Sequence, residues 1–351
     1  MALIKPFKAY RPAKGLEQTV AALPYDVYNK EEARAVVAKN NRSFLAIDRP
    51  ETQFPDSYDM YAPEVYEKAR DMISQWVEEK VFIRDETDCY YLYEQTMDGR
   101  TQTGIVACAS IDDYLNGVIK KHENTRADKE QDRIRHVDVC NMHTGPIFLA
   151  YKKNMTIQNV ISMIKDTVPV YDFVSEDGIT HRVWIVNETE KIATIKECFD
   201  NITDIYIADG HHRCASAVKV GLKRREENPG YNGTEEFNYF LAVLFADEEL
   251  KILDYNRVVF DLNGLSKECF LAQVFERCDL ITTMAEPYEP EKKGTFGMYL
   301  DGQWYGLKFK SAMITDDAVD GLDVSLLQNL ILGPILGIGD PKTDKRIDFV
   351  G

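Results

Sequence analysis

A short segment near the middle of the chain combines a turn with side chains that bind anions. Its residues are Asp209, Gly210, His211, His212 and Arg213. The apolar run Ile205–Ala208 before it predicts a buried strand, and the small residues after it predict a helix. The start of a helix presents free backbone N–H groups and the positive end of the helix dipole. Because Arg213 adds a forked guanidinium, the segment predicts a phosphate site.

Each residue of this turn has an expected role. Asp209 caps the helix or orients a metal-bound group, and Gly210 lets a ligand approach the backbone closely. His211, His212 and Arg213 hold phosphates. Cations at a helix N-terminus are normally unfavourable, so the pattern favours function over an Asp-capped helix with incidental imidazoles. A metal site on the two histidines is disfavoured, because adjacent helical side chains diverge by about 100°.

A second group of candidates lies in the charged stretch 116–139, which is expected to be helical. Its candidate residues are His122, Glu123, Thr125 and Arg133. The HExxH zinc motif is excluded, since Arg126 stands four positions after His122. Glu123 is a candidate general base or ligand to Mg²⁺ through water, and Arg133 could neutralise a transferring phosphoryl group. The alternative is a solvated helix, although like charges four residues apart disfavour it.

Two more candidates lie in turns. Thr144 precedes the apolar run Ile147–Ala150, and a threonine at the start of a strand could contact a phosphate. Asp26 lies between an apolar segment and the expected helix at 30–39. Asp26 is either a turn residue or a partner for a substrate amine or a metal-bound water.

Composition excludes several classes of protein. The chain has 351 residues, enough for two or three domains, and a net charge of −16, which counts against DNA as a partner. No apolar run approaches the ~18 residues of a membrane span, and no signal-peptide core is present. The seven cysteines include no CxxC pair, which indicates reduced thiols in a cytoplasmic protein and no zinc site.

The elements that position these residues alternate irregularly between helices and strands. Expected helices cover 30–39, 63–79, 188–199, 265–276 and 325–332, and isolated strands cover 205–208, 239–246 and 257–260. Asp-Gly turns predict three hairpins, at 89–111, 170–186 and 296–309. This mixture predicts an α/β (α+β mixed) fold with mixed sheets. We expect an N-terminal α/β region (1–115), a phosphate-binding core (116–228) and a C-terminal α/β region (229–351), with a boundary near the polar loop 224–233.

The turn resembles the DGHHR-type motif of the ParB/sulfiredoxin-like superfamily. Most of the chain resembles one family of unknown function that is labelled ParB-like or sporulation-regulator-like, over Pro6–Pro12, Pro24–Val27, Glu31–Arg34, His122–Thr125, Asp132–Arg133, Gly145–Phe148 and Ala208–Arg213. The resemblance implies a ParB/sulfiredoxin-like core whose turn grips nucleotide phosphates. Sulfiredoxins place a cysteine where this turn has histidine, and the helix-turn-helix of partitioning proteins is not evident. Family members are usually longer, so the strand-like end at 345–351 is expected to mark a fragment.

These features together predict a nucleotide-dependent phosphotransferase that acts on a small hydroxyl metabolite, with ATP or ADP and Mg²⁺ as cofactors. The resemblance implies a free-serine kinase as its most concrete form. In that hypothesis Glu123 takes the proton from the attacking hydroxyl, Asp209 orients a group or the metal, and Arg133 steadies charge in the transition state. The alternatives are a ParB-like regulator switched by nucleotide, or a ParB-like nuclease with Asp26, Glu123 and Asp209 as its metal ligands.

Overall fold

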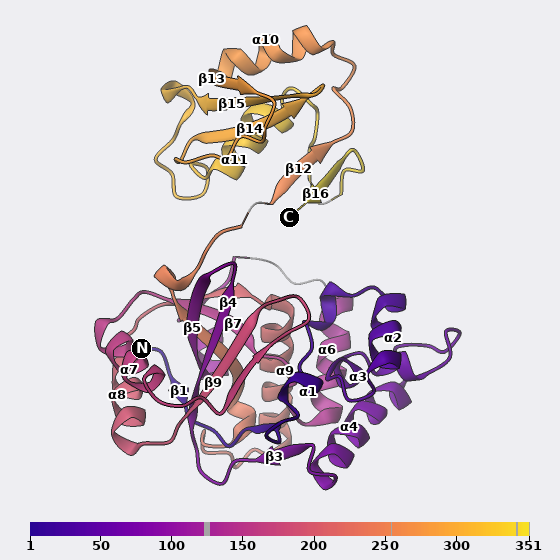
Figure 1. The fold of residues 1–351 in the computed structure, drawn as a ribbon, viewed down its shortest axis with the longest axis vertical. Coiled ribbons are helices and arrows are strands. Elements are labelled where there is room, and N and C mark those ends of the chain that lie inside the picture. Colours follow the sequence, from indigo (N-terminus) through magenta and orange to yellow (C-terminus); the bar gives the residue numbers. More distant parts are fainter. Residues whose placement is uncertain (123–126, 254, 342, 351) are drawn as a thin grey trace. The chain divides into compact units, whose positions relative to one another are not determined.

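The chain folds into two compact units, Met1–Lys251 and Ile252–Gly351 (Figure 1). A computed structural model describes residues 1–122, 127–253, 255–341 and 343–350. Each unit has its own apolar core. All the candidate site residues that the structure describes belong to the first unit, and so does the polar loop 224–233.

A mixed sheet forms the centre of the first unit. Within the described residues it has nine strands: β1 (Ile4–Lys5), β4 (Tyr90–Met97), β5 (Arg100–Ser110), β6 (Ile119–Lys120), β7 (Ile147–Tyr151), β8 (Tyr171–Val174), β9 (Thr180–Val186), β10 (Ile205–Asp209) and β11 (Tyr239–Ala246). The order is β6-β10-β7-β11-β5-β4-β9-β8, with β1 beside β5. Only the pairs β6–β10 and β7–β11 are parallel in this part of the chain. The mixed α/β class is therefore confirmed, and the sheet draws on all three regions expected from the sequence.

The Asp-Gly dipeptides turn the hairpins as predicted. The β4–β5 turn has Asp98 at φ 51° and Gly99 at φ 76°, and the turn after β14 in the second unit has Asp301 at φ 51° and Gly302 at φ 77°. Consecutive left-handed residues give a turn whose twist matches that of the paired strands. The β8–β9 hairpin turns at Asp177-Gly178, where Gly178 has φ 82°.

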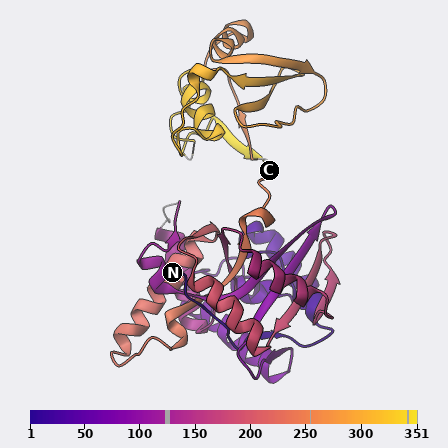
Figure 2. The ribbon, with the colours of Figure 1, turned by 90° about the vertical axis from the view of Figure 1, so that its left-hand side faces the viewer.

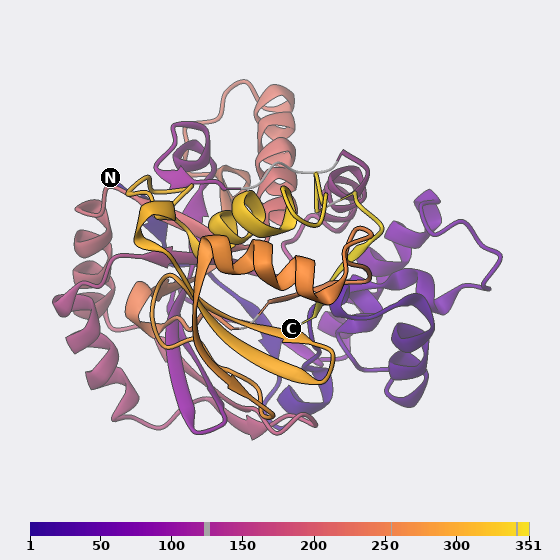
Figure 3. The ribbon, with the colours of Figure 1, turned by 90° about the horizontal axis from the view of Figure 1, so that it is seen from above.

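Helices cover the sheet and extend beyond one side of it. In Figure 1, α7 (Met155–Lys165) and α8 (Thr189–Asp200) lie to the left of the sheet, and Figure 2 shows them crossing its near face. On the other side α9 (His211–Glu227) packs against β7 and β11, and α6 (Ala127–Cys140) packs against α9. Beyond α6 lies a helical layer, also visible from above in Figure 3, made of α2 (Lys30–Lys39), α3 (Leu45–Asp48) and α4 (Pro63–Glu78).

The two longer helices of that layer follow directly from their sequences. Asn29 accepts a hydrogen bond from the Glu32 N–H and Glu32 accepts one from the Asn29 N–H, a capping box that begins α2 at the predicted residue. Pro63 begins α4, and the apolar stripe predicted for it is buried, including Met72 and Trp76. Shorter elements are α1 (Glu17–Val20), α5 (Ile111–Leu115), η1 (Tyr25–Val27), η2 (Pro50–Gln53), η3 (Glu236–Asn238), η4 (Asp247–Glu249), and the paired β2 (Tyr10–Pro12) and β3 (Phe82–Arg84).

The second unit is a small α+β fold. The antiparallel strands β13 (Cys278–Met284), β15 (Gln303–Phe309) and β14 (Thr295–Leu300) form one sheet, and β12 (Asn256–Val259) pairs with β16 (Ile347–Val350). Its apolar core also contains side chains of α10 (Lys267–Arg277), α11 (Asp323–Leu327) and the π-helix η6 (Gln328–Leu332). The short helix η5 (Ser311–Met313) follows β15 in the chain. Strand β13 was not predicted, because its outward residues include Leu280 and Ile281 and break the alternation of polar and apolar residues.

The expected helical stretch 116–139 is confirmed from Ala127 onward, where α6 begins, and is wrong near its start. Residues Ile119–Lys120 form strand β6 instead, with Ile119 buried and paired with Ile205 of β10. A strand of two residues has no periodicity that a sequence pattern can reveal. No helix in the part of the chain that the structure describes is long and apolar enough to cross a membrane.

Candidate functional site

Three loops meet at one edge of the central sheet. Strands β6 and β10 are parallel, so both end at this edge, and β7 is antiparallel to β10, so it begins there. Asp209 at the end of β10 is paired with Phe148 at the start of β7. The segments 121–122, 144–146 and 209–213 are therefore neighbours, which brings together candidates that the sequence places far apart.

The turn at Gly210 differs from its prediction in one respect. Strand β10 runs through Asp209, and Gly210 is the N-cap of α9 in the left-handed conformation with φ 93°. No side chain caps the helix. The expected cap by Asp209 is therefore wrong: its carboxylate accepts a hydrogen bond from Arg213 Nη2 at 2.6 Å. The N-cap residue of this 17-residue helix therefore has no side chain that could accept hydrogen bonds from the first backbone N–H groups.

The Arg213 guanidinium is held at the mouth of this helix. Its Nη1 donates to the Pro146 carbonyl at 2.7 Å, and Nη2 is paired with Asp209, which is itself two-thirds exposed. A Cβ at position 210 would lie 3.2 Å from Arg213 Nε, in addition to the strain of a positive φ. Glycine at 210 therefore lets the guanidinium lie over the turn.

The histidines of the turn differ in their surroundings. His211 is buried, and its ring packs edge-on against His122, with ring centroids 4.3 Å apart. His122 N also approaches His211 Nε2 at 3.5 Å. His212 lies in the first turn of α9, and its Nδ1 atom is buried without a hydrogen-bond partner among the described residues. The turn thus has one histidine that anchors the neighbouring loop and one with an unused ring nitrogen.

Arg133 reaches the same region from α6. Its Nε and Nη2 donate to Asp132 at 2.9 and 2.8 Å, and its guanidinium lies 4.3 Å from the ring centre of Tyr25. Asp132 also accepts a hydrogen bond from Tyr66 Oη. Burial by itself lowers the pKa of Arg133, but Asp132, Tyr25 and Asp48 together raise it above its ordinary value. Arg133 is therefore a buried, permanently charged group.

Asp48 is the residue that sequence reasoning missed. It is buried at the end of α3, and Thr144 is among the groups that lower the pKa of its carboxyl group. Burial raises the pKa of Asp48, while His136, Thr144, Arg133 and Arg213 act in the opposite direction. Both arginines are thus close enough to affect this one carboxyl group. The available signal was an aspartate that directly follows the apolar run Phe44–Ile47.

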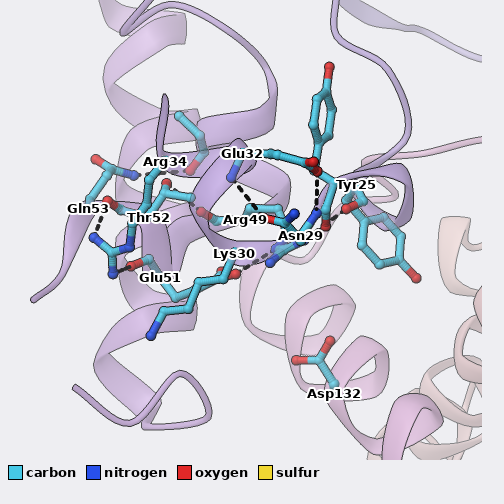
Figure 4. Close-up of polar contacts among 12 residues, drawn as sticks. Tyr25, Asn29, Lys30, Glu32, Arg34, Arg49, Glu51, Thr52, Gln53 and Asp132 are labelled. Carbon is cyan, nitrogen blue, oxygen red and sulfur yellow. Dashed lines mark hydrogen bonds and ion pairs between the residues drawn. The ribbon is translucent and has the colours of Figure 1, made fainter. Parts of the chain in front are cut away.

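Tyr25, in the short helix η1, interacts electrostatically with both arginines. Burial raises the pKa of Tyr25, and the charges of Arg133 and Arg213 act against it. Figure 4 shows how its turn is fixed: Arg49 Nη1 donates to the carbonyls of Tyr25 and Tyr28, both at 2.9 Å. Arg49 Nε is paired with Glu51 at 2.5 Å in a largely buried ion pair. The backbone of 25–28 is therefore held rigidly beside α6.

The remaining predicted residues fall into two groups. Asp26 is exposed in η1, next to Tyr25, and Thr144 lies between Asp48 and the Arg213 loop. Glu123 and Thr125 lie outside the described residues. Within those that are described, no group of three or more His, Cys, Asp or Glu side chains could hold a metal ion.

The histidine after α6 leads to a prediction about stability. His143 Nε2 lies 3.2 Å from the Tyr239 carbonyl, and burial lowers the pKa of His143. The unfolded chain, with an ordinary imidazole pKa of about 6.5, then binds a proton that the folded chain does not. Stability should therefore fall as pH drops below about 6.5. The free energy of unfolding is measured in urea at pH 7.5 and at pH 5.5. It should change less between these pH values for His143→Gln than for the parent chain, and an equal change would show that His143 is not the group responsible.

Comparison with known protein families assigns this chain to one of them. Residues 4–325 match the model of DUF1015, described as a protein of unknown function. The chain belongs to the DUF1015 family. The match spans nearly the whole first unit, including the turn at Gly210, and most of the second.

Membership of DUF1015 corrects the resemblance drawn from the sequence. The match is to this family and not to the ParB/sulfiredoxin-like superfamily, so that assignment is wrong. A short motif at a helix start arises wherever an anion is bound at such a turn, which is why it suggested the wrong family. No curated protein and no solved structure matches the chain.

Proposed function

We propose that this DUF1015 protein is a phosphotransferase that moves a phosphoryl group from a nucleotide to the hydroxyl of a small metabolite. The observation that carries the proposal is that two arginines from packed helices, Arg133 of α6 and Arg213 at the start of α9, both act on Asp48 and Tyr25. Their helices are distant in sequence, and the pKa values of Asp48 and Tyr25 are influenced by both.

The helix start supplies the first part of an anion site. A phosphate there receives hydrogen bonds from backbone N–H groups and is favoured by the helix dipole. Gly210 removes the side chain that would block its approach. Arg213 adds donors at the same place, and an arriving phosphate would compete with the exposed Asp209 carboxylate for them.

Arg133 supplies the second part. A buried, fixed cation stabilises charge that develops during transfer more strongly than one in water, because it needs no reorganisation. Arg133 is held in place by Asp132 and by the Tyr25 ring. Phosphoryl transfer depends mainly on positioning and electrostatic stabilisation, which is what this arrangement offers.

The acceptor side of the site is provided by carboxylates. In the transfer, the acceptor oxygen bonds to phosphorus, the bond from phosphorus to the nucleotide's bridging oxygen breaks, and the hydroxyl proton passes to a base. Glu123 is the candidate base. Asp209 would hold Mg²⁺ together with nucleotide phosphates, since this ion usually needs only one or two protein carboxylates. Mg²⁺ would neutralise charge on the transferred group.

Serine is the first acceptor to test. Asp26 is an exposed carboxylate beside Tyr25 and suits an ammonium group. A small molecule that carries both a hydroxyl and an ammonium group therefore fits the chemistry of the two sides of the site.

The test is direct. The full chain is incubated with ATP or ADP, Mg²⁺ and serine, and then with other small hydroxyl compounds, and phosphomonoester products are followed by ³¹P NMR. Nucleotide affinity is measured separately by calorimetry. We expect nucleotide binding and a phosphomonoester that an Arg213→Gln protein forms about 10²–10³-fold more slowly. A protein that binds no nucleotide, or that binds it and leaves it unchanged with every acceptor, would contradict the proposal.

A further inference from the structure

A large cavity lies within the first unit, away from the candidate site. Its volume is about 1070 Å³. Its walls come from the segment Phe7–Tyr10, from α4, α6 and α9, and from strands β5 and β11. None of the turn residues 209–213 lines it, and neither do Arg133 and Tyr25. It therefore offers a second place for a ligand, distinct from the phosphate turn.

The floor and inner walls of this cavity are apolar. They include Ile73, Val77, Cys108, Cys140, Val220 and Leu241. Burial raises the pKa of the Cys108 and Cys140 thiols to about 12, so both are neutral groups at physiological pH. Ligand pockets for small organic molecules are typically lined in this way and hold ~300–1,000 Å³, so the cavity is large enough for such a molecule.

One end of the cavity carries positive charge. Lys8 and Arg84 both line it and are exposed, and neither forms an ion pair with a carboxylate in the described part of the chain. The Arg84 guanidinium instead lies 5.5 Å from the ring centre of Tyr10, which also lines the cavity. Tyr10 pairs with Arg84 in the sheet, so Lys8 and Arg84 lie on neighbouring segments of the wall. Asp88 and Glu78 are the lining carboxylates that form no ion pair in the described part of the chain. The remaining charged lining residues are paired: Arg70 with Asp71, Arg224 with Asp138, and Glu236 with Lys5.

We propose that this cavity binds an amphipathic organic anion, with its apolar body along α4, α6 and α9 and its anionic group between Lys8 and Arg84, and that its occupant acts on the phosphate site through α6 and α9. A carboxylate, a sulfonate and a phosphate monoester share the chemistry required at the cationic end. The binding part of this inference does not depend on the phosphotransferase function, whereas the communication between sites rests on it.

The two helices give the communication a physical basis. Val137 and Cys140 of α6 line the cavity, and the same helix carries Arg133 and His136 toward Asp48. Cys140 Sγ lies 4.0 Å from His136 Nδ1. On α9, Arg213 lies at the phosphate turn, and Ala217 and Val220 line the cavity one and two turns further along. A ligand that shifts either helix would move a residue of both sites.

Binding is tested with 8-anilinonaphthalene-1-sulfonate, whose fluorescence rises in apolar surroundings. The Ser74→Trp variant places an indole in the cavity from an exposed position of α4, so the fold should not be disturbed. Its matched control is Gln75→Trp, the next exposed residue, which does not line the cavity. We expect the dissociation constant of the probe to rise at least about tenfold in Ser74→Trp and to stay unchanged in Gln75→Trp.

The anionic part of the proposal has its own variants. The double variant Lys8→Glu/Arg84→Glu should weaken probe binding about tenfold. Lys14→Glu/Arg42→Glu changes the net charge equally at exposed positions outside the cavity lining and should leave binding unchanged. No probe binding to the parent chain, or equal binding by Ser74→Trp and Gln75→Trp, overturns the site. Equal weakening by the two double variants overturns the anion.

The communication is tested by linkage. Saturating probe should change the dissociation constant of ADP by about threefold or more, and ADP should change that of the probe by the same factor. An unchanged ADP affinity while the probe is bound in the cavity overturns the communication. If ADP does not bind at all, the proposed phosphotransferase fails, while the probe titrations still decide whether the cavity is a site.

Discussion

Replacement of Arg213 by glutamine is expected to lower kcat/KM for phosphoryl transfer by about 10²–10³-fold, as loss of a preorganised donor to the transition state does in other enzymes. Arg213 offers two guanidinium nitrogens at the open end of α9, and Pro146 and Asp209 fix where they point. Glutamine keeps a polar side chain but loses the charge and the fork. Nucleotide affinity, measured by calorimetry, should fall by about 10- to 100-fold, since hydrogen bonds to charged groups contribute ~1.5–3 kcal/mol.

Two companion variants make this result specific. Arg135→Gln is the matched control, because Arg135 is exposed on α6 and, among the described residues, donates only to the Tyr61 carbonyl at 3.3 Å. It should leave affinity and rate unchanged. Arg213→Lys keeps the charge without the planar fork and should fall between glutamine and the parent chain. Arg213→Gln with parent-like affinity and rate would show that phosphate is bound elsewhere.

Replacement of Asp48 by alanine is expected to destabilise the first unit by about 1–3 kcal/mol, the usual cost when a buried polar group loses a favourable neighbour. Asp48 is a buried carboxyl group on which the charges of His136, Arg133 and Arg213 act. Without it, Arg133 keeps Asp132 but loses the second negative group that favours its charge. The phosphate site should be disordered along with the fold.

The measurement must separate the two units. Trp76 and Trp184 are buried in the first unit and Trp304 lies in the second, so urea unfolding is followed by tryptophan fluorescence in a Trp304→Phe background. Asp172→Ala is the control, because Asp172 is half exposed and its pair with Arg182 should contribute no more than about 1 kcal/mol. Equal losses for Asp48→Ala and Asp172→Ala would mean that Asp48 is not the hub of a buried charge cluster.

Asp48 and Arg213 belong to the same candidate site. Asp48 interacts electrostatically with both guanidinium groups from the interior, and Asp209 accepts a hydrogen bond from Arg213 at the surface. Asp48 favours the positive charge of Arg133. The hydrogen bond that Arg213 donates to Asp209 can instead be exchanged for one to a phosphate. Stability and function are therefore expected to separate: Asp48 variants lose the fold, and Arg213 variants keep it.

Local signals account for what the sequence determined by itself. The apolar run before Asp209, the left-handed glycine and the helix that follows are set by neighbouring residues, and so are the Asn29–Glu32 capping box and the Asp-Gly hairpins. These features fix φ angles, caps and the faces of helices within a few residues. Among them, the strand before Asp209, the helix starts after Asn29 and Gly210 and the Asp-Gly hairpin turns were predicted correctly.

The tertiary structure decided what these candidates surround. Asp48 and Tyr25 come from the helical layer, and only the packing of α6 between that layer and α9 brings them to the two arginines. The parallel pairing of β6 with β10 could not be predicted either, because a strand of two residues has no alternation of polar and apolar residues to recognise. The sequence also assigned Asp209 to the helix cap, whereas the fold pairs it with Arg213. A charge cluster depends on distances between segments far apart in the chain, and local patterns cannot set those distances.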